Sequence, residues 1–241
     1  MKLRRVLVVS AGLAILAIAG GAAYFTGLWI PNHPSMTDYP VRGIDVSNHQ
    51  GAIEWKRVPQ GPVHFAYIKA TEGQDFRDAR FAENWRGSAD AGLKRGAYHF
   101  FTLKSTGQQQ AANFIAVVPK DPEALPPVVD VEQWGNASTR PSVEAFQHEL
   151  SDFMSAVRSH YGQEPVIYTA NDYRNYYLRG FPQGRLWIRS VITSPRLTDH
   201  APWHFWQYSE KKRVPGINGF VDQNVFNGDR TALEAFVHQP N

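Results

Sequence analysis

The chain contains no cysteine among its 241 residues. Disulfide bonds and thiolate metal sites are therefore excluded, and no redox role is open to cysteine. The histidines form neither an HExxH motif nor a pair at close metal-ligand spacing. We therefore expect His49, His64 and His99 to be hydrogen-bonded structural residues, and we predict no metal and no cofactor.

Beyond its first five residues, the chain also lacks an excess of charge of either sign. The net charge of +3 comes from 25 basic and 22 acidic residues. Three basic residues, Lys2, Arg4 and Arg5, stand at the start, which leaves 22 basic residues to balance the 22 acidic ones, all of which follow residue 30. A nucleic-acid-binding domain is expected to carry an excess of basic residues. No nucleic-acid partner is predicted.

The segment from residue 6 to residue 30 has no charged residue. As a helix it is long enough to cross a hydrocarbon core of about 30 Å. We predict a transmembrane signal anchor over residues 6–30, with a short cytoplasmic basic end at 1–5 and a spacer with three prolines at 31–41. The membrane would then be one partner of the chain.

The basic residues before this segment predict its orientation. Under the positive-inside rule they remain in the cytoplasm, so the following domain lies outside the inner membrane, in the periplasm or on the cell-wall side. The run Ala19-Gly-Gly-Ala-Ala23 also permits signal-peptide cleavage, in which case the domain would be secreted. The uncleaved, single-pass anchor is the preferred interpretation.

Residues 42–241 are expected to form one α/β domain. Short apolar runs predict strands at 43–47, 63–70, 96–101, 127–132, 165–169 and 186–190, and helical patterns at 80–91, 106–118 and 142–161 alternate with them. Asp78 is a possible cap of the first helix, and Gly92 and Gly162 are expected stops. Because loops rather than helices separate 203–209 from 219–225, we predict an irregular TIM-like (β/α) barrel with short or missing late helices.

Two acidic residues close one of these strands. Asp130 and Glu132 follow an apolar run, and side chains at i and i+2 on a strand project from the same face about 6.6 Å apart. Two carboxyls in a partly dry cleft raise each other's pKa, so one is expected to hold a proton near neutral pH. Glycosidases use such a pair, although acids at a strand end are also common as solvated groups.

Asp45 and Asp222 lie on further predicted strands, and four converging acids favour an active site at the carboxyl ends of a barrel.

Seven stretches in order resemble the family 25 glycoside hydrolases, lysozymes that cut bacterial cell-wall glycan. The resemblance covers nearly the whole domain, from Arg42 to about Phe226, and implies both the barrel and the reaction. The matching stretches are Gly43-Ile-Asp-Val-Ser-Asn-His-Gln-Gly51, Tyr67-Ile-Lys-Ala-Thr-Glu-Gly73, Gly96-Ala-Tyr-His-Phe-Phe101, Val128-Val-Asp-Val-Glu132, Ile167-Tyr-Thr169, Trp206-Gln-Tyr-Ser209 and Val221-Asp-Gln-Asn224.

The resemblance implies a role for each acid. Glu132 would be the general acid that protonates the leaving glycosidic oxygen, and Asp130 its partner carboxylate, with Asp45 and Asp222 completing the cluster. The expected reaction is retaining hydrolysis of the β-1,4 bond between N-acetylmuramic acid and N-acetylglucosamine in peptidoglycan. In such enzymes the substrate's own acetamido group is thought to be the nucleophile, whereas the spacing of the two acids is compatible with either role for Asp130.

Aromatic faces and fixed polar groups recognise sugar rings. Tyr98 and Tyr168 match cleft positions of the family and are predicted to bind substrate, whereas Tyr67, Trp134 and Trp206 are weaker candidates that packing also explains. Lys69 ends an apolar strand, so an acidic partner is expected nearby, and it is a further substrate-binding candidate. One departure from the family pattern is Arg189-Ser-Val191, which stands where a small residue and an aromatic usually follow Leu186-Trp-Ile188.

Two other functions are compatible with the sequence. One is a non-catalytic module that binds cell-wall glycan in the same groove, against which the intact acids argue. The other is a glycosidase for a different amino sugar polymer such as chitin. The oligomeric state cannot be inferred from these patterns.

Overall fold

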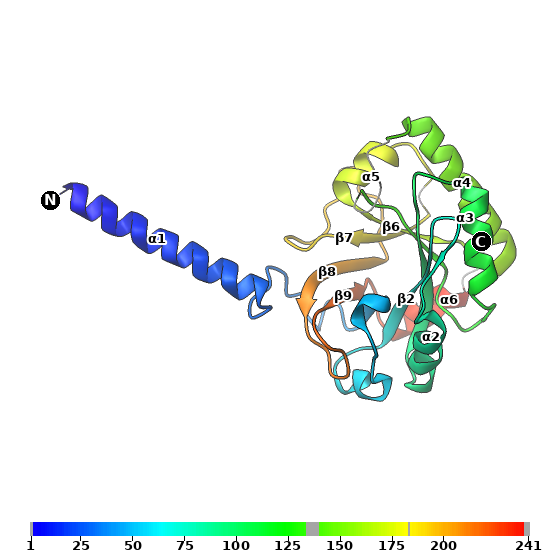
Figure 1. The fold of residues 1–241 in the computed structure, drawn as a ribbon, viewed down its shortest axis with the longest axis horizontal. Coiled ribbons are helices and arrows are strands. Elements are labelled where there is room, and N and C mark those ends of the chain that lie inside the picture. Colours follow the sequence, from blue (N-terminus) through cyan, green and yellow to red (C-terminus); the bar gives the residue numbers. More distant parts are fainter. Residues whose placement is uncertain (1, 134–139, 183, 239–241) are drawn as a thin grey trace.

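The strands of the domain close into a barrel (Figure 1). The computed structural model describes residues 2–133, 140–182 and 184–238, except for the side chains at 2–9, 11 and 12. Its strands are β1 (Arg42–Val46), β2 (Phe65–Glu72), β3 (Phe76–Arg77), β4 (Lys94–Phe100), β5 (Val128–Asp130), β6 (Val166–Ala170), β7 (Arg185–Arg189), β8 (Phe205–Lys212) and β9 (Val221–Phe226). They form one sheet in the order β1-β9-β8-β7-β6-β5-β4-β2-β3, and a pairing of β1 with β2 closes it.

The barrel is parallel except at one strand. β9 runs antiparallel to both of its neighbours, β1 and β8, and β3 is a short antiparallel addition to β2. Within the described part of the chain, no α-helix separates β7 from β8 or β8 from β9. The predicted irregular TIM-like barrel with missing late helices is therefore confirmed.

The helices are α1 (Lys2–Phe25), α2 (Phe81–Asp90), α3 (Gly107–Val117), α4 (Val143–Tyr161), α5 (Asn171–Tyr177) and α6 (Arg230–His238), with 3-10 turns at Asn48–Gln50 and Trp55–Gln60. α4 begins and ends as the sequence predicts. The Ser142 hydroxyl accepts a hydrogen bond from the Ala145 amide at 3.2 Å, and Gly162 adopts a φ of 72° just after the last turn. Asp78 does not cap α2, which has Arg80 at its N-cap, and its carboxylate instead accepts from the backbone amides of Arg80 and Asn48.

Aromatic side chains fill the inside of the barrel at the end where the parallel strands begin. Phe65 lies edge-on to Phe205, with ring centroids 5.3 Å apart, and Tyr67 packs on Trp187 at 5.0 Å. α6 closes this end, because Phe236 contacts Phe205 at 5.5 Å and is buried with it. The opposite end, where the strands stop, remains open for a site.

Residues 30–41 pack against the barrel, whereas the sequence predicted a spacer. Ile30 is 3% exposed and lies in an apolar cluster with Trp206, Tyr208 and Val225. The Tyr39 ring lies 5.9 Å from that of Trp206. This segment covers the outer faces of β8 and β9, because the late crossovers contain no helices that would cover them.

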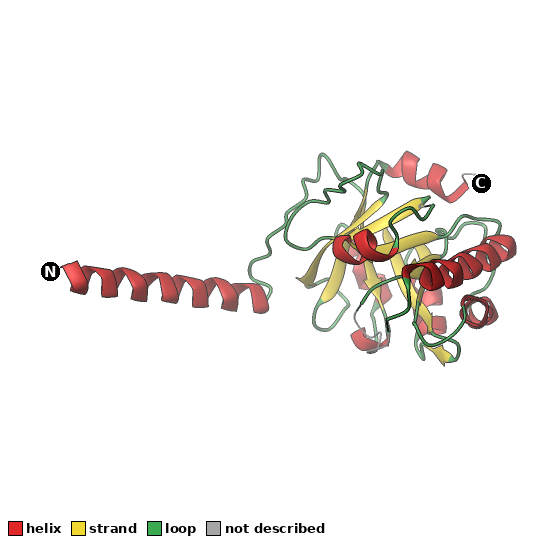
Figure 2. Ribbon diagram, turned by 90° about the horizontal axis from the view of Figure 1, so that it is seen from above, coloured by secondary structure: helices red, strands yellow, loops and turns green. Residues whose placement is uncertain are grey.

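α1 extends away from the barrel as one helix (Figures 1 and 2). Among the residues that the structure describes, no helix is long and apolar enough to span a membrane. The predicted transmembrane segment at 6–30 is therefore not supported by the structure. Part of that prediction lies outside the described residues, because the side chains at 6–9, 11 and 12 are not among them.

Candidate active site

A small cavity lies at the open end of the barrel, where the parallel strands stop. Its volume is about 100 Å³. All four predicted acids line it, together with both predicted tyrosines and three residues that the sequence did not single out: Asp45, Asp130, Glu132, Asp222, Tyr98, Tyr168, Val128, Trp187 and Gln207. The fold thus brings together side chains from seven strands and from the residues just after β5.

Asp130 and Glu132 enter the cavity from the end of β5. The strand stops at Asp130, so Glu132 lies just beyond it, but the Val131 amide still donates to the Tyr168 carbonyl at 2.9 Å and prolongs the ladder. Val129 and Val131 are buried in the layer between strands and helices. The alternation of a strand therefore directs the two carboxyls to the same side. The Asp130 Oδ1 atom is buried and has no hydrogen-bond partner among the described residues.

Burial changes the protonation of this pair. Desolvation, and then the charge of Glu132, raises the pKa of Asp130 well above its ordinary value. Desolvation also raises the pKa of Glu132 to about 7, although the Arg189 guanidinium acts in the opposite direction. Glu132 is therefore partly protonated near neutral pH and can give or take a proton at little cost.

Asp45 and Asp222 form a second carboxyl pair, across β1 and β9. They stand opposite each other in the antiparallel ladder and are hydrogen-bonded to each other. Desolvation raises the pKa of Asp45 to about 6 and that of Asp222 well above its ordinary value. Two further carboxyls thus border the cavity, and the pair is not fully ionised at neutral pH.

Two amides that sequence reasoning missed hold Asp45. The Oδ2 atom of Asp45 accepts from Asn224 Nδ2 at 2.7 Å and from Gln207 Nε2 at 3.1 Å. Asn224 Oδ1 accepts from the Trp187 indole at 2.9 Å, and Gln207 Oε1 accepts from the Tyr168 hydroxyl at 2.8 Å. Gln207 and Asn224 lie within stretches that carry the family resemblance, and this was the available signal.

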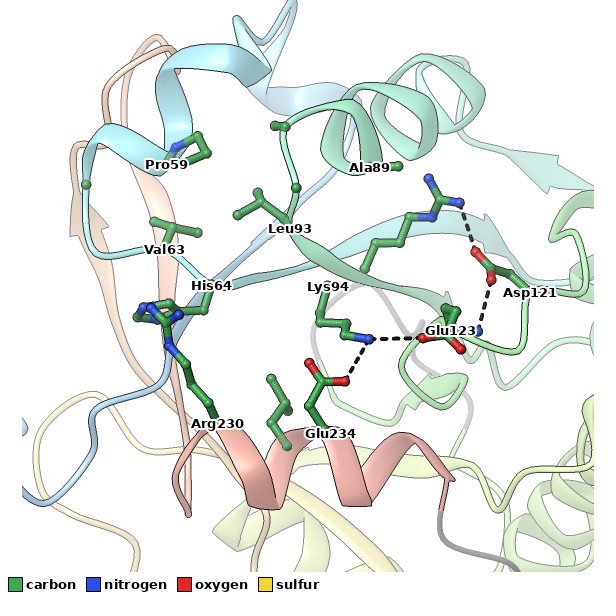
Figure 3. A pocket seen from close by; sticks show the side chains of 15 residues that line it. Pro59, Val63, His64, Ala89, Leu93, Lys94, Asp121, Glu123, Arg230 and Glu234 are labelled. Carbon is green, nitrogen blue, oxygen red and sulfur yellow. Dashed lines mark hydrogen bonds and ion pairs between the residues drawn. The ribbon is translucent and has the colours of Figure 1, made fainter.

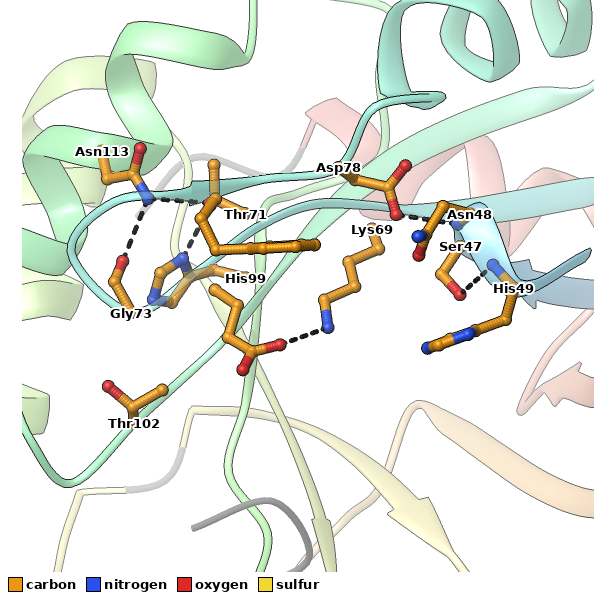
Figure 4. Close-up of polar contacts among 12 residues, drawn as sticks. Ser47, Asn48, His49, Lys69, Thr71, Gly73, Asp78, His99, Thr102 and Asn113 are labelled. Atoms are coloured by element: carbon orange, nitrogen blue, oxygen red, sulfur yellow. Dashed lines mark hydrogen bonds and ion pairs between the residues drawn. The ribbon is translucent and has the colours of Figure 1, made fainter. Parts of the chain in front are cut away.

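Lys69 lies outside the residues that line the cavity. Its Nζ atom forms an ion pair with Glu72 at 2.6 Å and lies 5.4 Å from the Phe76 ring centroid and 5.1 Å from that of Phe100 (Figure 4). Glu72 is the acidic partner that the apolar strand led us to expect. The charge of Lys69 nevertheless lowers the pKa values of both Asp130 and Glu132.

The departure from the family pattern, Arg189, faces the acids from β7. Its guanidinium forms an ion pair with Glu210 on β8, with Nε 2.6 Å from Oε1. The positive charge of Arg189 lowers the pKa values of Glu132 and Asp222, while the negative charge of Glu210 raises them. Arg189 and Lys69 are therefore two cations near the cavity whose charges act on the predicted acid.

Two of the weaker aromatic candidates, Tyr67 and Trp206, do not line the cavity. Tyr67 is buried in the barrel interior, where its hydroxyl donates to the Pro126 carbonyl at 3.2 Å. Trp206 belongs to the cluster outside the barrel, and its indole donates to the Ser190 carbonyl at 2.8 Å. Trp134 lies outside the described residues.

Two of the three histidines that we expected to be structural, His99 and His64, form side-chain hydrogen bonds within the scaffold. His99 is hydrogen-bonded to the Thr71 hydroxyl at 2.7 Å (Figure 4). Its other ring nitrogen lies 3.1 Å from the Gln110 side-chain oxygen, and burial lowers its pKa to about 3. His64 Nδ1 accepts from the Arg42 amide at 3.1 Å, and His49 is exposed. In the described part of the chain, no group of three or more His, Asp or Glu side chains is arranged to bind a metal ion.

A larger cavity, of about 690 Å³, lies at the opposite end of the barrel, between the start of β4 and α6. Five of its charged side chains are paired with one another (Figure 3). Lys94 lies 2.8 Å from Glu234 and 3.3 Å from Glu123, and Arg95 lies 2.8 Å from Asp121. In α/β barrels this end supports the scaffold rather than the chemistry. We therefore assign the site to the smaller cavity.

Comparison with known proteins agrees with this geometry. Residues 44–217 match the family model described as Glycosyl hydrolases family 25. The chain is 37% identical over 205 residues to the protein YegX of Escherichia coli (strain K12), with 83% of this chain and 74% of the relative covered. It is 33% identical over 210 residues to Lysozyme M1 of Streptomyces globisporus, with 82% and 71% covered.

Two solved structures have the same barrel. One is a family 25 glycosyl hydrolase from Bacillus anthracis, with a TM-score of 0.81, 36% identity, and coverage of 86% of this chain and 97% of the other. The second is the bacterial lysozyme from Streptomyces coelicolor, with a TM-score of 0.76, 35% identity, and coverage of 82% and 96%. The residues that match the family model, 44–217, include three of the four acids, Asp45, Asp130 and Glu132.

Proposed function

The chain belongs to glycosyl hydrolases family 25, and from this premise we propose that it is a lysozyme-type muramidase. It hydrolyses the β-1,4 bond between N-acetylmuramic acid and N-acetylglucosamine in bacterial peptidoglycan. The observation that carries the proposal is the pair at the end of β5. Glu132, whose pKa is about 7, stands beside Asp130, which has an unpartnered buried oxygen in the same cavity. Relatives named lysozyme and muramidase support the choice of substrate.

In the proposed reaction, Glu132 protonates the leaving glycosidic oxygen. A carboxyl with a pKa near the working pH is protonated often enough to act as an acid and is a strong enough base to take the proton back from water later. Burial of its surroundings strengthens these proton transfers, because water does not screen the charges. Glu132 thus acts first as acid and then as base.

Asp130 is proposed to hold the substrate's acetamido group. Its free Oδ1 atom is the acceptor that an acetamido N–H needs, and this hydrogen bond turns the acetamido oxygen toward the anomeric carbon. That oxygen attacks as the leaving group departs, and water then opens the cyclic intermediate from the opposite face. Two inversions give retention, which is a recognised exception to the scheme of two catalytic carboxylates.

The remaining cavity residues are proposed to shape the site around the sugar. Tyr168 offers a buried ring beside the acids, and Tyr98 a partly buried one. Lys69 acts through its charge on Asp130 and Glu132, and Asp45 and Asp222 place negative charge where an oxocarbenium-like transition state develops positive charge. No metal or cofactor takes part in this proposal.

The test uses the full-length chain in detergent, because residues 30–41 pack on the barrel. Purified peptidoglycan is digested, the new reducing ends are converted with borohydride, and the products are identified by mass spectrometry, with Glu132→Gln as the control. Reduced muramic acid ends from the wild type alone are expected. Reduced glucosamine ends would refute the bond assignment, and glycan binding without new ends from several wall types would refute catalysis.

We also propose that the barrel works outside the inner membrane. The support is the sequence, in which an uncharged segment at 6–30 follows Lys2, Arg4 and Arg5. Cell fractionation of the tagged chain, with protease added to intact spheroplasts, tests this location. Recovery in the membrane fraction with a protease-sensitive barrel is expected. A protected barrel would refute it, and a shorter mature mass would indicate cleavage.

A further inference from the structure

We propose that Gln207 and Asn224 are positioning residues, which fix the negative charge of the Asp45–Asp222 pair on Asp45 and leave the shared proton on Asp222. The arrangement of the pair follows from contacts within the structure. Its effect on catalysis rests on the proposed function, because it acts through Glu132.

The first step is that the pair contains a proton. Asp45 and Asp222 face each other across the β1–β9 ladder, where directly opposed side chains approach closely, and their carboxyl groups are hydrogen-bonded. Two ionised carboxylates have only acceptor atoms. A hydrogen bond between them therefore requires that one carboxyl is protonated, as in other closely spaced pairs of acids.

The second step decides which acid holds that proton. Oδ2 of Asp45 accepts from Asn224 Nδ2 at 2.7 Å and from Gln207 Nε2 at 3.1 Å. Amide donors stabilise the ionised form of a carboxyl. With two amides and the Asp222 hydroxyl directed at it, Asp45 is the better place for the charge, and Asp222 is the donor.

The third step is that these amides cannot easily turn. The Trp187 indole N–H is a donor only, so the Asn224 oxygen must face it at 2.9 Å, and the Asn224 nitrogen is thereby directed at Asp45. If Gln207 were turned, its oxygen would face Oδ2 of Asp45, and two acceptors repel. With Oε1 toward the Tyr168 hydroxyl, all of these groups are satisfied. The network therefore has one consistent set of protons.

The fourth step links the pair to Glu132. The negative charge of Asp45 raises the pKa of Glu132, which keeps the proposed acid protonated near neutral pH. The other charges that act on the two carboxyl pairs are Lys69 and Glu72 on β2, Arg189 on β7 and Glu210 on β8. Two titratable tyrosines, Tyr98 on β4 and Tyr168 on β6, also face the acids, and Asp78 before α2 acts on Tyr98. The two amides carry no charge, and both direct their N–H groups at Asp45.

The proposal is tested first without substrate. Infrared spectra of the full-length protein at pH 7 are compared for the wild type and Asp222→Asn. The wild type is expected to show a protonated carboxyl absorption that this substitution removes. Unchanged absorption in Asp222→Asn would show that the proton is not on Asp222 and would overturn the proposal, whether or not the protein cleaves peptidoglycan.

The second test measures kcat/KM against pH for Asn224→Leu and Gln207→Met, each of which removes one donor at nearly constant volume. Gln223→Met is the matched control, because Gln223 lies between Asp222 and Asn224 on β9 and its amide nitrogen has no partner in the described part of the chain. Loss of charge on Asp45 should move the alkaline limb to lower pH and reduce kcat/KM at pH 7 about tenfold, the change that one unit of pKa produces.

At acidic pH these variants should come within about threefold of the wild type, because Glu132 is then protonated without help from Asp45. The control should keep the wild-type profile. An equal loss at every pH would indicate a merely structural role and would overturn the proposal. If Asn224→Leu fails to fold, Gln207→Met supplies the same comparison, with circular dichroism and thermal unfolding as checks of the fold.

Discussion

The two ends of the barrel differ in how the charges of their residues are compensated. At the end where the strands begin, Lys94 is bonded to Glu123 and Glu234, and the Glu234 hydrogen bond is the largest cause of a raised pKa of Lys94. At the end where they stop, four carboxyls share one cavity, and burial is the largest cause of the raised pKa of each.

The two ends do not differ in residue type. They differ in how deeply the acids are buried and in whether a cation neutralises them. Glu123 and Glu234 are more than half exposed, and a cation neutralises them. Asp130 and Asp45 are almost fully buried, and the nearest cations at that end, Lys69 and Arg189, are themselves paired with acids. Buried acids without full compensation destabilise a fold unless they take up protons. Such a cluster is expected where a protein needs proton chemistry.

The largest contrast between the ends is expected from removing one carboxyl at each. Glu132→Gln should lower kcat by about 10³-fold, because the amide cannot give a proton to the glycosidic oxygen. Glu123→Gln, at the opposite end, should leave kcat unchanged. Both are measured by release of reducing ends from peptidoglycan, with circular dichroism as the check of the fold. Equal losses in the two variants would erase the contrast.

A smaller loss is expected from Asp130→Asn. An amide retains an oxygen in the cavity but cannot supply negative charge to the acetamido group during attack, so kcat should fall by about 10²-fold. The thermal midpoint should not fall, because a buried carboxyl with an unpartnered oxygen is replaced by a neutral group. A large drop in the midpoint would show that Asp130 stabilises the barrel, as the paired acids of the other end do.

The ends should also differ in how pH affects stability. Burial raises the folded-state pKa of Asp45 to about 6 and also raises those of Asp130 and Asp222, whereas in the unfolded chain they have ordinary values near 4. The folded state then holds protons that the unfolded state has released. The contribution of these carboxyls to the free energy of unfolding is therefore greatest below about pH 4. It is lost as pH rises through the folded pKa values, by at most about 1.4 kcal/mol per pH unit for each proton.

Urea unfolding at pH 5, 6, 7 and 8 measures this dependence. The double variant Asp45→Asn with Asp222→Asn should flatten it, while Glu234→Gln should not, because Glu234 is paired and exposed. A wild-type protein whose stability rises over this range would contradict the proton uptake at the open end.

Arg189 offers a finer test of the open end. Its positive charge lowers the pKa of Glu132, so Arg189→Met should move the alkaline limb of kcat/KM to higher pH. Arg95→Met, which breaks the Asp121 pair at the opposite end, is the matched control and should leave the limb in place. The profile is measured on soluble peptidoglycan fragments. A limb that moves to lower pH in Arg189→Met would contradict this role.

The smallest effect is expected from Lys94→Met. The ion pairs of Lys94 with Glu123 and Glu234 are partly exposed, so their loss should cost about 1 kcal/mol or less in the free energy of unfolding. Activity should stay at the wild-type level at all pH values. A clear loss of activity would assign a function to the larger cavity and break the comparison on which these predictions rest.

The acids at the open end were largely predictable. Strand alternation places Asp130 and Glu132 on one side, and the carboxyl ends of parallel strands meet at one end of a barrel. The protonation of the second pair was not, because Asp45 meets Asn224 across 179 residues of chain and Gln207 across 162. Hydrogen bonds over such separations depend on the register of β1, β8 and β9, which local patterns do not contain.

The N-terminal segment shows the same limit. Three prolines and several polar residues at 31–41 predicted a spacer, yet Tyr39 packs beside Trp206, as does Ile30 just before this stretch. The local sequence around these two residues carries no sign of their partner. The outer faces of β8 and β9 need a cover because helices are missing there, and only the complete arrangement of strands reveals that need.

By itself, the sequence determined the alternation of strands and helices, the missing late crossovers and the convergence of four acids, because these follow from periodicity and from where strands end. Only the tertiary structure decided which acid is hydrogen-bonded to which, which amides hold Asp45, and which charges reach Glu132. The physical reason is that a pKa depends on burial and on atoms within a few ångströms, and residues far apart in the chain supply those atoms.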